Sequence, residues 1–249
     1  MVSAVGGCTV RGSVTASVSP IARGALQVTD SWTTRLWTQV EPTYRAILAH
    51  PFLTGLTDGS LEQNRFAYYL AQDAHYLRDY ARALAVVGAK AATHADTGLF
   101  AGHAAETVAV ELALHETLLP QLGLDPAELD AIAPSPTTTA YTSYLLAAAY
   151  GGTFAEGVAA VLPCYWIYQR VGAELAGRGS PDPRYARWID TYGGDAFAGT
   201  VSEVLALADR IGAALDPDES ARAARHFATT SRYEWMFWDA AWRREAWPV

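Results

Sequence analysis

The sequence predicts an all-α protein built as a single-domain helical bundle. From residue 31 onward, apolar residues recur every three or four positions, which is the period of a helix packed against a core. Helix-start signals precede several of these segments, and no segment alternates polar and apolar residues over the length of a strand. With 249 residues, 51% of them hydrophobic, the chain can bury a substantial core in one domain.

The helical domain is expected to span residues 30–249. Residues 1–29 are rich in Ser, Gly, Val and Thr and show no periodic apolar face. We therefore expect a flexible N-terminal extension there, outside the packed domain.

Three helices have explicit start signals. SLEQ at residues 60–63 has the residue types of a capping box and predicts a long helix to about Lys90. TFAE at residues 153–156 predicts a second capping box, with a helix to about Gly177. DPDE at residues 216–219 predicts a third start, with proline at the first helical position. Further helices, separated by Gly- and Pro-rich clusters, are expected near residues 31–49, 94–122, 137–150 and 183–213.

Charge and cysteine content exclude several classes of protein. The formal net charge is -8 and no basic block is present, which argues against nucleic acid as a partner, whereas an acidic surface mildly attracts small cations. No apolar run approaches the ~20 residues of a membrane-spanning helix. The two cysteines, Cys8 and Cys164, are too far apart for a disulfide framework or a CxxC metal site, so we expect a cytoplasmic protein.

Two carboxylates fall on otherwise apolar helix faces. Asp73 lies among Phe66, Tyr69, Leu70, Tyr76, Tyr80 and Leu84, and Glu234 lies among Phe227, Thr230, Ser231, Trp238 and Ala241. A buried charge is costly unless it is partnered, and either acid alone could simply tie helices together by binding a tyrosine or an arginine. Both acids, a cysteine and several tyrosines in one all-α domain predict a polar-lined pocket between helices.

A proline interrupts the apolar run AAVLPCYWIY at residues 159–168. Pro163 removes one helical hydrogen bond and clashes with the carbonyl of Ala159, so we expect a bend at a cost of about 3 kcal/mol. The bend is expected to turn the Cys164 sulfur toward a cavity, with Tyr168 one turn later on the same side. A small buried core residue is the alternative for Cys164 that spacing leaves open.

Four segments, in this order, carry a resemblance to a known family. They are PFLTGLTDGSLEQNRFAYYLAQDAHYL, YTSYLLAAAYGGTFAEGVAAVLPCYWIYQRVG, WIDTYGGDAF and SRYEWMFWDAAW. Together they resemble the TenA / thiaminase II family, the aminopyrimidine aminohydrolases, from about residue 30 to the end. The chain is most similar to the cysteine-containing branch.

The resemblance implies a haem-oxygenase-like helical domain, usually a homotetramer, that acts in thiamin salvage without a metal or organic cofactor. The implied reaction is hydrolysis at the pyrimidine methylene. Thiamin, or its breakdown product 4-amino-5-aminomethyl-2-methylpyrimidine, would give 4-amino-5-hydroxymethyl-2-methylpyrimidine. The partner implied is thus a small pyrimidine.

The resemblance also implies roles for seven residues. Cys164 corresponds to the nucleophile, and Glu234 to the catalytic glutamate. Asp73 corresponds to the acid that holds the aminopyrimidine edge, and the pocket aromatic residues correspond to Tyr76, Tyr141, Tyr168 and Tyr192.

The chemistry of these residues fits the implied roles. Addition of a thiolate to the ring would let the leaving group depart, and water would then reverse the addition. We expect tyrosine hydroxyls to lower the pKa of Cys164 below its free value of ~8.5. Glu234 would protonate a ring nitrogen, which requires a carboxylic acid whose pKa is raised in an apolar setting.

Three other residues and two other functions complete the predictions. His75 could line the pocket, but we favour contact with a neighbouring helix, and we interpret Glu111 and His115 as a structural pair rather than metal ligands. The alternative functions are an iron-dependent oxidase on the same scaffold and a non-catalytic pyrimidine-binding or regulatory protein.

Overall fold

The computed structural model describes residues 30–113 and 131–249. Within these ranges all regular secondary structure is helical, which confirms the all-α prediction. The helices are α1 (Trp32–Leu48), α2 (Pro51–Asp58), α3 (Gln63–Ala89), α4 (His94–Ala113), α7 (Pro136–Gly151), α8 (Phe154–Ala176), α9 (Pro183–Gly193), α10 (Asp195–Gly212) and α11 (Pro217–Arg243). None of them combines the length and the apolar character needed to cross a bilayer.

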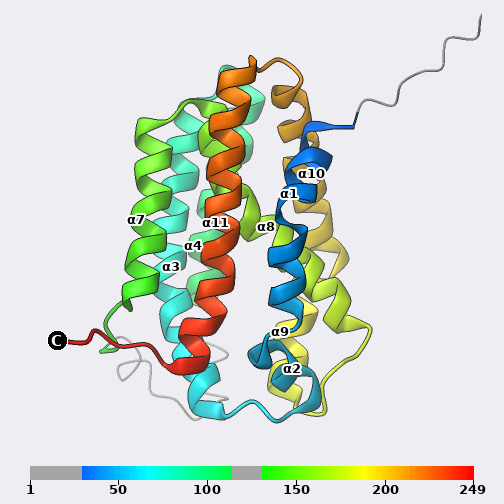
Figure 1. Ribbon diagram of the computed structural model, residues 1–249, viewed down its shortest axis with the longest axis vertical. Coiled ribbons are helices and arrows are strands. Elements are labelled where there is room, and N and C mark those ends of the chain that lie inside the picture. Colours follow the sequence, from blue (N-terminus) through cyan, green and yellow to red (C-terminus); the bar gives the residue numbers. More distant parts are fainter. Residues whose placement is uncertain (1–29, 114–130) are drawn as a thin grey trace, which may run out of the picture.

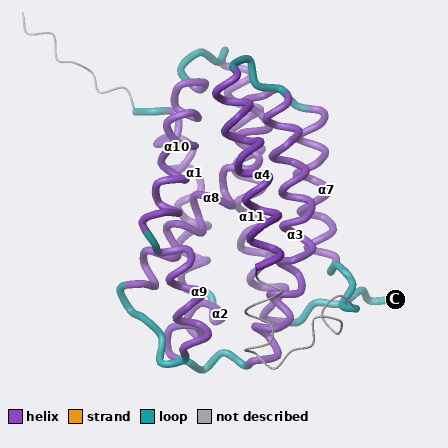
Figure 2. Tube along the Cα trace, turned by 180° about the vertical axis from the view of Figure 1, so that it is seen from behind, coloured by secondary structure: helices purple, strands orange, loops and turns teal. Residues whose placement is uncertain are grey.

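The long helices run side by side along the long axis of the molecule (Figure 1). α3, α4 and α7 form one side, whereas α1, α9 and α10 form the other, and the view from behind shows the same division (Figure 2). α8 lies between the two sides and packs against α7, α9, α10 and α11. A residue on α8 can therefore contact helices from both sides.

Two of the three predicted helix starts have the expected caps. The Thr153 hydroxyl accepts from the Glu156 N–H, and the Glu156 carboxylate accepts from the Thr153 N–H, so α8 begins with a complete capping box. The Asp216 carboxylate accepts from the N–H of Glu219 and caps α11, with Pro217 at the first helical position. These local interactions satisfy N–H groups that would otherwise lack partners.

The predicted capping box at residues 60–63 is wrong. The Ser60 N–H donates to the Asp58 carboxylate (2.8 Å) in the turn after α2, and α3 begins at Gln63 without a side-chain cap. The predicted end of this helix near Lys90 is confirmed, because Lys90 is the C-cap of α3. The helix α2 was not predicted because eight residues are too few for a clear period.

The helix predicted over 183–213 is two helices. Gly194 is extended (φ -78°, ψ 156°), so α9 ends at Gly193 and α10 begins at Asp195. The helix predicted over 94–122 is described as far as Ala113. The break at Gly194 matters for function, because it brings the end of α9 and the start of α10 to one cavity.

A glycine allows α8 and α9 to approach closely. A Cβ atom at Gly172 would lie 2.4 Å from the carbonyl carbon of Tyr192 and 2.6 Å from the nitrogen of Gly193. Only a residue without a side chain permits this backbone contact. α8 continues through Pro163 to Ala176, and the bend expected at Pro163 stays a prediction.

Candidate active site

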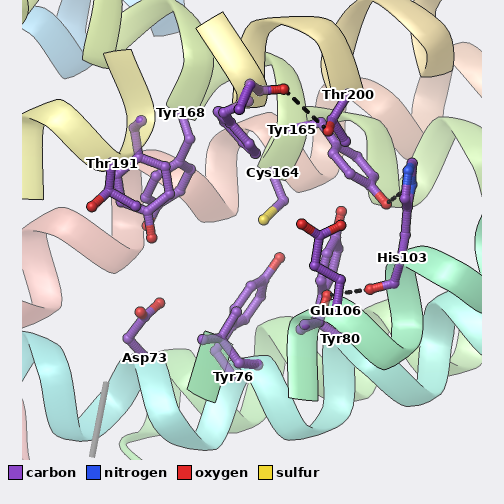
Figure 3. Close-up of a pocket in the computed structure, with 15 residues that line it drawn as sticks. Asp73, Tyr76, Tyr80, His103, Glu106, Cys164, Tyr165, Tyr168, Thr191 and Thr200 are labelled. Carbon is purple, nitrogen blue, oxygen red and sulfur yellow. Dashed lines mark hydrogen bonds between the residues drawn. The ribbon is translucent and has the colours of Figure 1, made fainter. Parts of the chain in front are cut away.

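A cavity of about 280 Å³ lies between α3, α4, α8, α9 and α10. Its volume suits a small molecule rather than a polymer. The described residues that line it are Asp73, Tyr76, Leu77, Tyr80, His103, Glu106, Thr107, Cys164, Tyr165, Tyr168, Thr191, Tyr192, Ala196, Phe197 and Thr200. Ten of these residues are labelled in Figure 3.

α3 supplies one wall of the cavity. Asp73, Tyr76 and Tyr80 follow each other at three- and four-residue spacing and all line the cavity, with Asp73 only 5% exposed. The prediction that Asp73 points to the interior is confirmed. Its carboxylate lies across the cavity from Tyr168 of α8 (Figure 3).

The Cys164 thiol lies on the facing wall, formed by α8. Cys164 and Tyr168, one helical turn apart, both line the cavity as predicted. The Tyr76 hydroxyl points toward the Cys164 sulfur (Figure 3). It is buried and makes no hydrogen bond within the described residues, whereas the Tyr80 hydroxyl donates to the carbonyl of Val161 (3.0 Å). Tyr76 thus keeps a proton to donate to a thiolate or a ligand.

The lowered pKa expected for the Cys164 thiol is wrong. Burial raises the pKa of Cys164 well above its ordinary value, and the nearby Glu234 carboxylate raises it further. The hydroxyls of Tyr76 and Tyr80 act in the opposite direction but do not compensate. The thiol is therefore protonated at neutral pH.

Glu234 and Tyr141 lie behind the cavity wall. Glu234 is 1% exposed, and the Tyr141 hydroxyl donates to its carboxylate (2.6 Å). Burial raises the pKa of Glu234 to about 8, although the Tyr141 hydrogen bond lowers it. Neither residue is among those that line the cavity, since the ring of Tyr76 packs on that of Tyr141 with centroids 4.9 Å apart. The inward position and raised pKa predicted for Glu234 agree with the structure.

Tyr168 and Tyr192 form the third side of the cavity. Their rings lie 4.9 Å apart, and the Tyr168 hydroxyl pairs with that of Tyr69 (3.1 Å). Tyr192 reaches the cavity because Gly172 lets the end of α9 touch α8. Five of the seven residues predicted for the site thus line one cavity, and the other two lie directly behind it.

The sequence did not identify the part of the wall formed by α4 and α10. His103, Glu106 and Thr107 come from α4, and Ala196, Phe197 and Thr200 come from α10. The i, i+3, i+4 spacing of the α4 residues shows that they share a face, but spacing does not show that this face meets a cavity. Tyr80 and Tyr165 could have been proposed, since each is within one turn of a predicted site residue.

The remaining predictions for charged residues concern positions outside the cavity. The His75 ring does not line the cavity, as favoured from the sequence, but its partner is the carbonyl of Ile132 (2.7 Å), which lies in the segment before α7 and not on a helix. The side chains of Glu111 and His115 lie outside the described residues. In the described part of the chain, no three His, Cys, Asp or Glu side chains are grouped so that they could hold a metal ion.

The fold and the cavity define the class of this protein. It is a helical bundle with a small-molecule site, in which a thiol, carboxyl groups and tyrosines meet inside the bundle. The sequence model of the TENA/THI-4/PQQC family matches residues 37–244, and the chain belongs to this family.

Individual relatives agree with this assignment. The chain is similar to the aminopyrimidine aminohydrolase of Bacillus subtilis (strain 168), with 39% identity over 198 residues, which cover 80% of this chain and 84% of that protein. It also resembles a TenA homologue from P. horikoshii OT3, with a TM-score of 0.79 and 31% identity over 86% of this chain and 99% of that one.

A more distant structure supports the fold alone. A Shewanella denitrificans OS217 domain with a heme oxygenase-like fold aligns with a TM-score of 0.70 and 17% identity, covering 87% of this chain and 94% of that one. The haem-oxygenase-like fold expected from the sequence is confirmed.

Proposed function

We propose that this protein is a thiamin-salvage hydrolase. It would release 4-amino-5-hydroxymethyl-2-methylpyrimidine from 4-amino-5-aminomethyl-2-methylpyrimidine, from thiamin, or from both. The observation that carries the proposal is the cavity in which Cys164, Asp73 and Tyr76 face one another, with Glu234 directly behind. Similarity to an aminopyrimidine aminohydrolase over most of the chain supports it.

Asp73 and the tyrosines would bind the pyrimidine. The Asp73 carboxylate is suited to accept hydrogen bonds from the 4-amino group, because an ionised carboxylate only accepts. The rings of Tyr168 and Tyr192 offer aromatic surfaces against which the pyrimidine can stack. Binding in this orientation brings the ring toward Cys164, on the wall that faces Asp73.

Cys164 and Glu234 would carry the reaction. The sulfur adds to a ring carbon while Glu234 gives its proton to a ring nitrogen, and the thiol proton passes to the Glu234 carboxylate. One proton thus moves overall from sulfur to ring. The electron pair gained by the ring expels the leaving group, with the electrons of its bond, from the methylene carbon. Water then adds at that carbon and releases one proton to solvent. Finally the carbon–sulfur bond breaks, and the ring-nitrogen proton returns through Glu234 to the departing thiolate, which restores the aromatic ring and the thiol.

This role for Glu234 requires a small movement. Glu234 does not line the cavity, and the Tyr76 ring packs on Tyr141, the donor to Glu234, so the Tyr76 ring would shift to bring Glu234 to the pyrimidine. The unpartnered Tyr76 hydroxyl would gain a hydrogen bond from that shift, with the thiolate as its acceptor. A thiol that loses its proton only as the sulfur adds to the ring agrees with the raised pKa of Cys164.

Product formation by the purified protein tests the proposal. Thiamin and the aminomethylpyrimidine are supplied in parallel, with Cys164→Ala as the control. We expect hydroxymethylpyrimidine from at least one substrate and a loss of at least ~10³-fold in the variant. Retention of near-normal turnover by the variant would contradict the covalent mechanism.

The same experiment addresses the two alternative functions. Tight pyrimidine binding without turnover would favour a binding or regulatory protein. Stoichiometric iron in the purified protein, together with no hydrolysis, would favour an oxidase. The homotetramer and the cytoplasmic location stay predictions, and sedimentation of the purified protein measures the first of them.

A further inference from the structure

α4 forms part of the mouth of the cavity, together with exposed residues of α9 and α10. His103, Glu106 and Thr107 line the cavity from this helix, and Glu106 is exposed to solvent. In Figure 3, Cys164 lies between Asp73 on one side and Glu106 and His103 on the other. The cavity therefore has a buried carboxylate at one end and a solvent-facing carboxylate at the other.

No positively charged side chain balances these two acids at the cavity wall. Neither lysine nor arginine is found among the described residues that line it. Burial lowers the pKa of His103, so its ring is neutral at pH 7, and the Tyr165 hydroxyl lies 3.0 Å from its Nδ1. Glu203, on the exposed surface of α10, adds a further negative charge near His103. The mouth thus has a negative potential.

The proposed substrate orientation leaves room for the leaving group at this mouth. With the 4-amino group at Asp73 and the ring against Cys164, the cavity continues past Cys164 to Glu106 on α4 (Figure 3), and the leaving group would occupy this part. Both leaving groups are cationic in the substrate: a primary alkylamine is protonated at neutral pH, as lysine is, and the thiazolium of thiamin carries a permanent positive charge.

We infer that Glu106 binds the positively charged leaving group and so determines specificity for cationic substituents on the pyrimidine. This inference rests on the proposed function. It adds a binding contact at the end of the site that none of the seven predicted residues occupies.

The contact has a kinetic consequence. The ammonium departs as ammonia and the thiazolium as a neutral thiazole, because each takes the electron pair of the broken carbon–nitrogen bond. Because the leaving group keeps its charge until the carbon–nitrogen bond breaks, Glu106 stabilises the bound substrate and the preceding addition of sulfur to the ring to a similar extent. Such an interaction lowers KM without raising kcat.

The test is Glu106→Gln, which removes the charge and keeps the shape. We expect KM for both substrates to rise roughly threefold to tenfold, with kcat changed by less than about twofold. The neutral hydroxymethylpyrimidine should bind to wild type and variant with equal affinity. Glu203→Gln is the matched control, because it removes an equal charge near the mouth but outside the cavity wall.

Three results would overturn the inference. Unchanged KM in Glu106→Gln would show that the carboxylate does not bind the leaving group. An equal rise in KM in Glu203→Gln would assign the effect to the general surface charge. A large fall in kcat would indicate proton transfer rather than binding. Absence of turnover in the wild type, by contrast, would contradict the proposed function itself.

Discussion

Two glutamates, one at the start of α8 and one midway along α11, are similarly buried but differ in their surroundings. Glu156 is 6% exposed and Glu234 is 1% exposed. Burial alone would raise the pKa of Glu156, but the Thr153 N–H and the Arg222 guanidinium lower it below its ordinary value. Glu234 has one neutral donor, Tyr141, and burial raises its pKa to about 8.

The comparison separates structural from chemical use of a buried acid. At Glu156 the helix cap and an arginine stabilise the ionised form, which ties α8 to α11. At Glu234 no cation from the described residues offsets the loss of hydration, so the acid keeps its proton at neutral pH. Burial is common to both sites, and the nature of the hydrogen-bond donors decides the role.

The largest expected effect is on catalysis. Glu234→Gln should reduce kcat by ~10²–10³-fold, because the amide cannot deliver a proton to the ring. Glu156→Gln makes the same chemical change in a helix cap. Its kcat should stay within about threefold of the wild-type value, and its main effect should be a lower free energy of unfolding. Steady-state kinetics of both variants measure the difference. Equal losses in the two variants would remove the distinction between them.

A second prediction disturbs the cavity without changing a charge. Gly172→Ala should destabilise the protein by about 1–3 kcal/mol and reduce activity, because the methyl group collides with the backbone at Tyr192. Gly199→Ala is the control, since a Cβ there meets no atom within 4 Å and a helix favours alanine. Chemical denaturation measures both variants. Equal stability of Gly172→Ala and the wild type would contradict the close contact.

The pH dependence of stability should have opposite signs for the two glutamates. The folded-state pKa of Glu234 is raised, so its contribution is lost as pH rises from about 4.5 to about 8. The folded-state pKa of Glu156 is lowered from 4.5, so its contribution is lost as pH falls below that value. As the pH rises from 5 to 8, the Tm of Glu234→Gln should increase relative to that of the wild type. The Tm of Glu156→Gln should stay below that of the wild type by a constant amount over this range, and the difference should shrink only at acid pH. Parallel Tm curves would contradict this.

The smallest expected effect comes from the donor to Glu234. Tyr141→Phe removes a hydrogen bond that favours the ionised carboxylate, so the pKa of Glu234 should rise further. The upper limb of the pH profile of kcat should move to higher pH by roughly one unit. A shift to lower pH would mean that Tyr141 does not stabilise the ionised form.

Much of the fold and the inner site could be predicted from the sequence. The spacing of Asp73 and Glu234 among apolar residues identified both buried acids, because a helix presents every third or fourth residue to the core. The capping box at Thr153 was equally clear, since its partners are three residues apart. Local rules were sufficient where the interacting groups are close in sequence.

The predictions failed where distant segments decide the outcome. Ser60 has the residue type of an N-cap, but the turn with Asp58 uses its N–H, and α3 starts later. The α4 face with His103 and Glu106 lines the cavity only because of how α4, α8 and α10 pack. The raised pKa of Cys164 arises from burial by several helices, and no short motif reports burial.

Infrared titration of Glu234 tests the central claim most directly. The carboxylic C=O band that is present in wild type and absent in Glu234→Gln should be visible at pH 6 and disappear with a midpoint near 8. Glu156→Gln should retain this band unchanged, because Glu156 is already ionised at pH 6. A Glu234 band that is absent at pH 6 would show an ionised carboxylate and contradict its role as the proton donor to the ring.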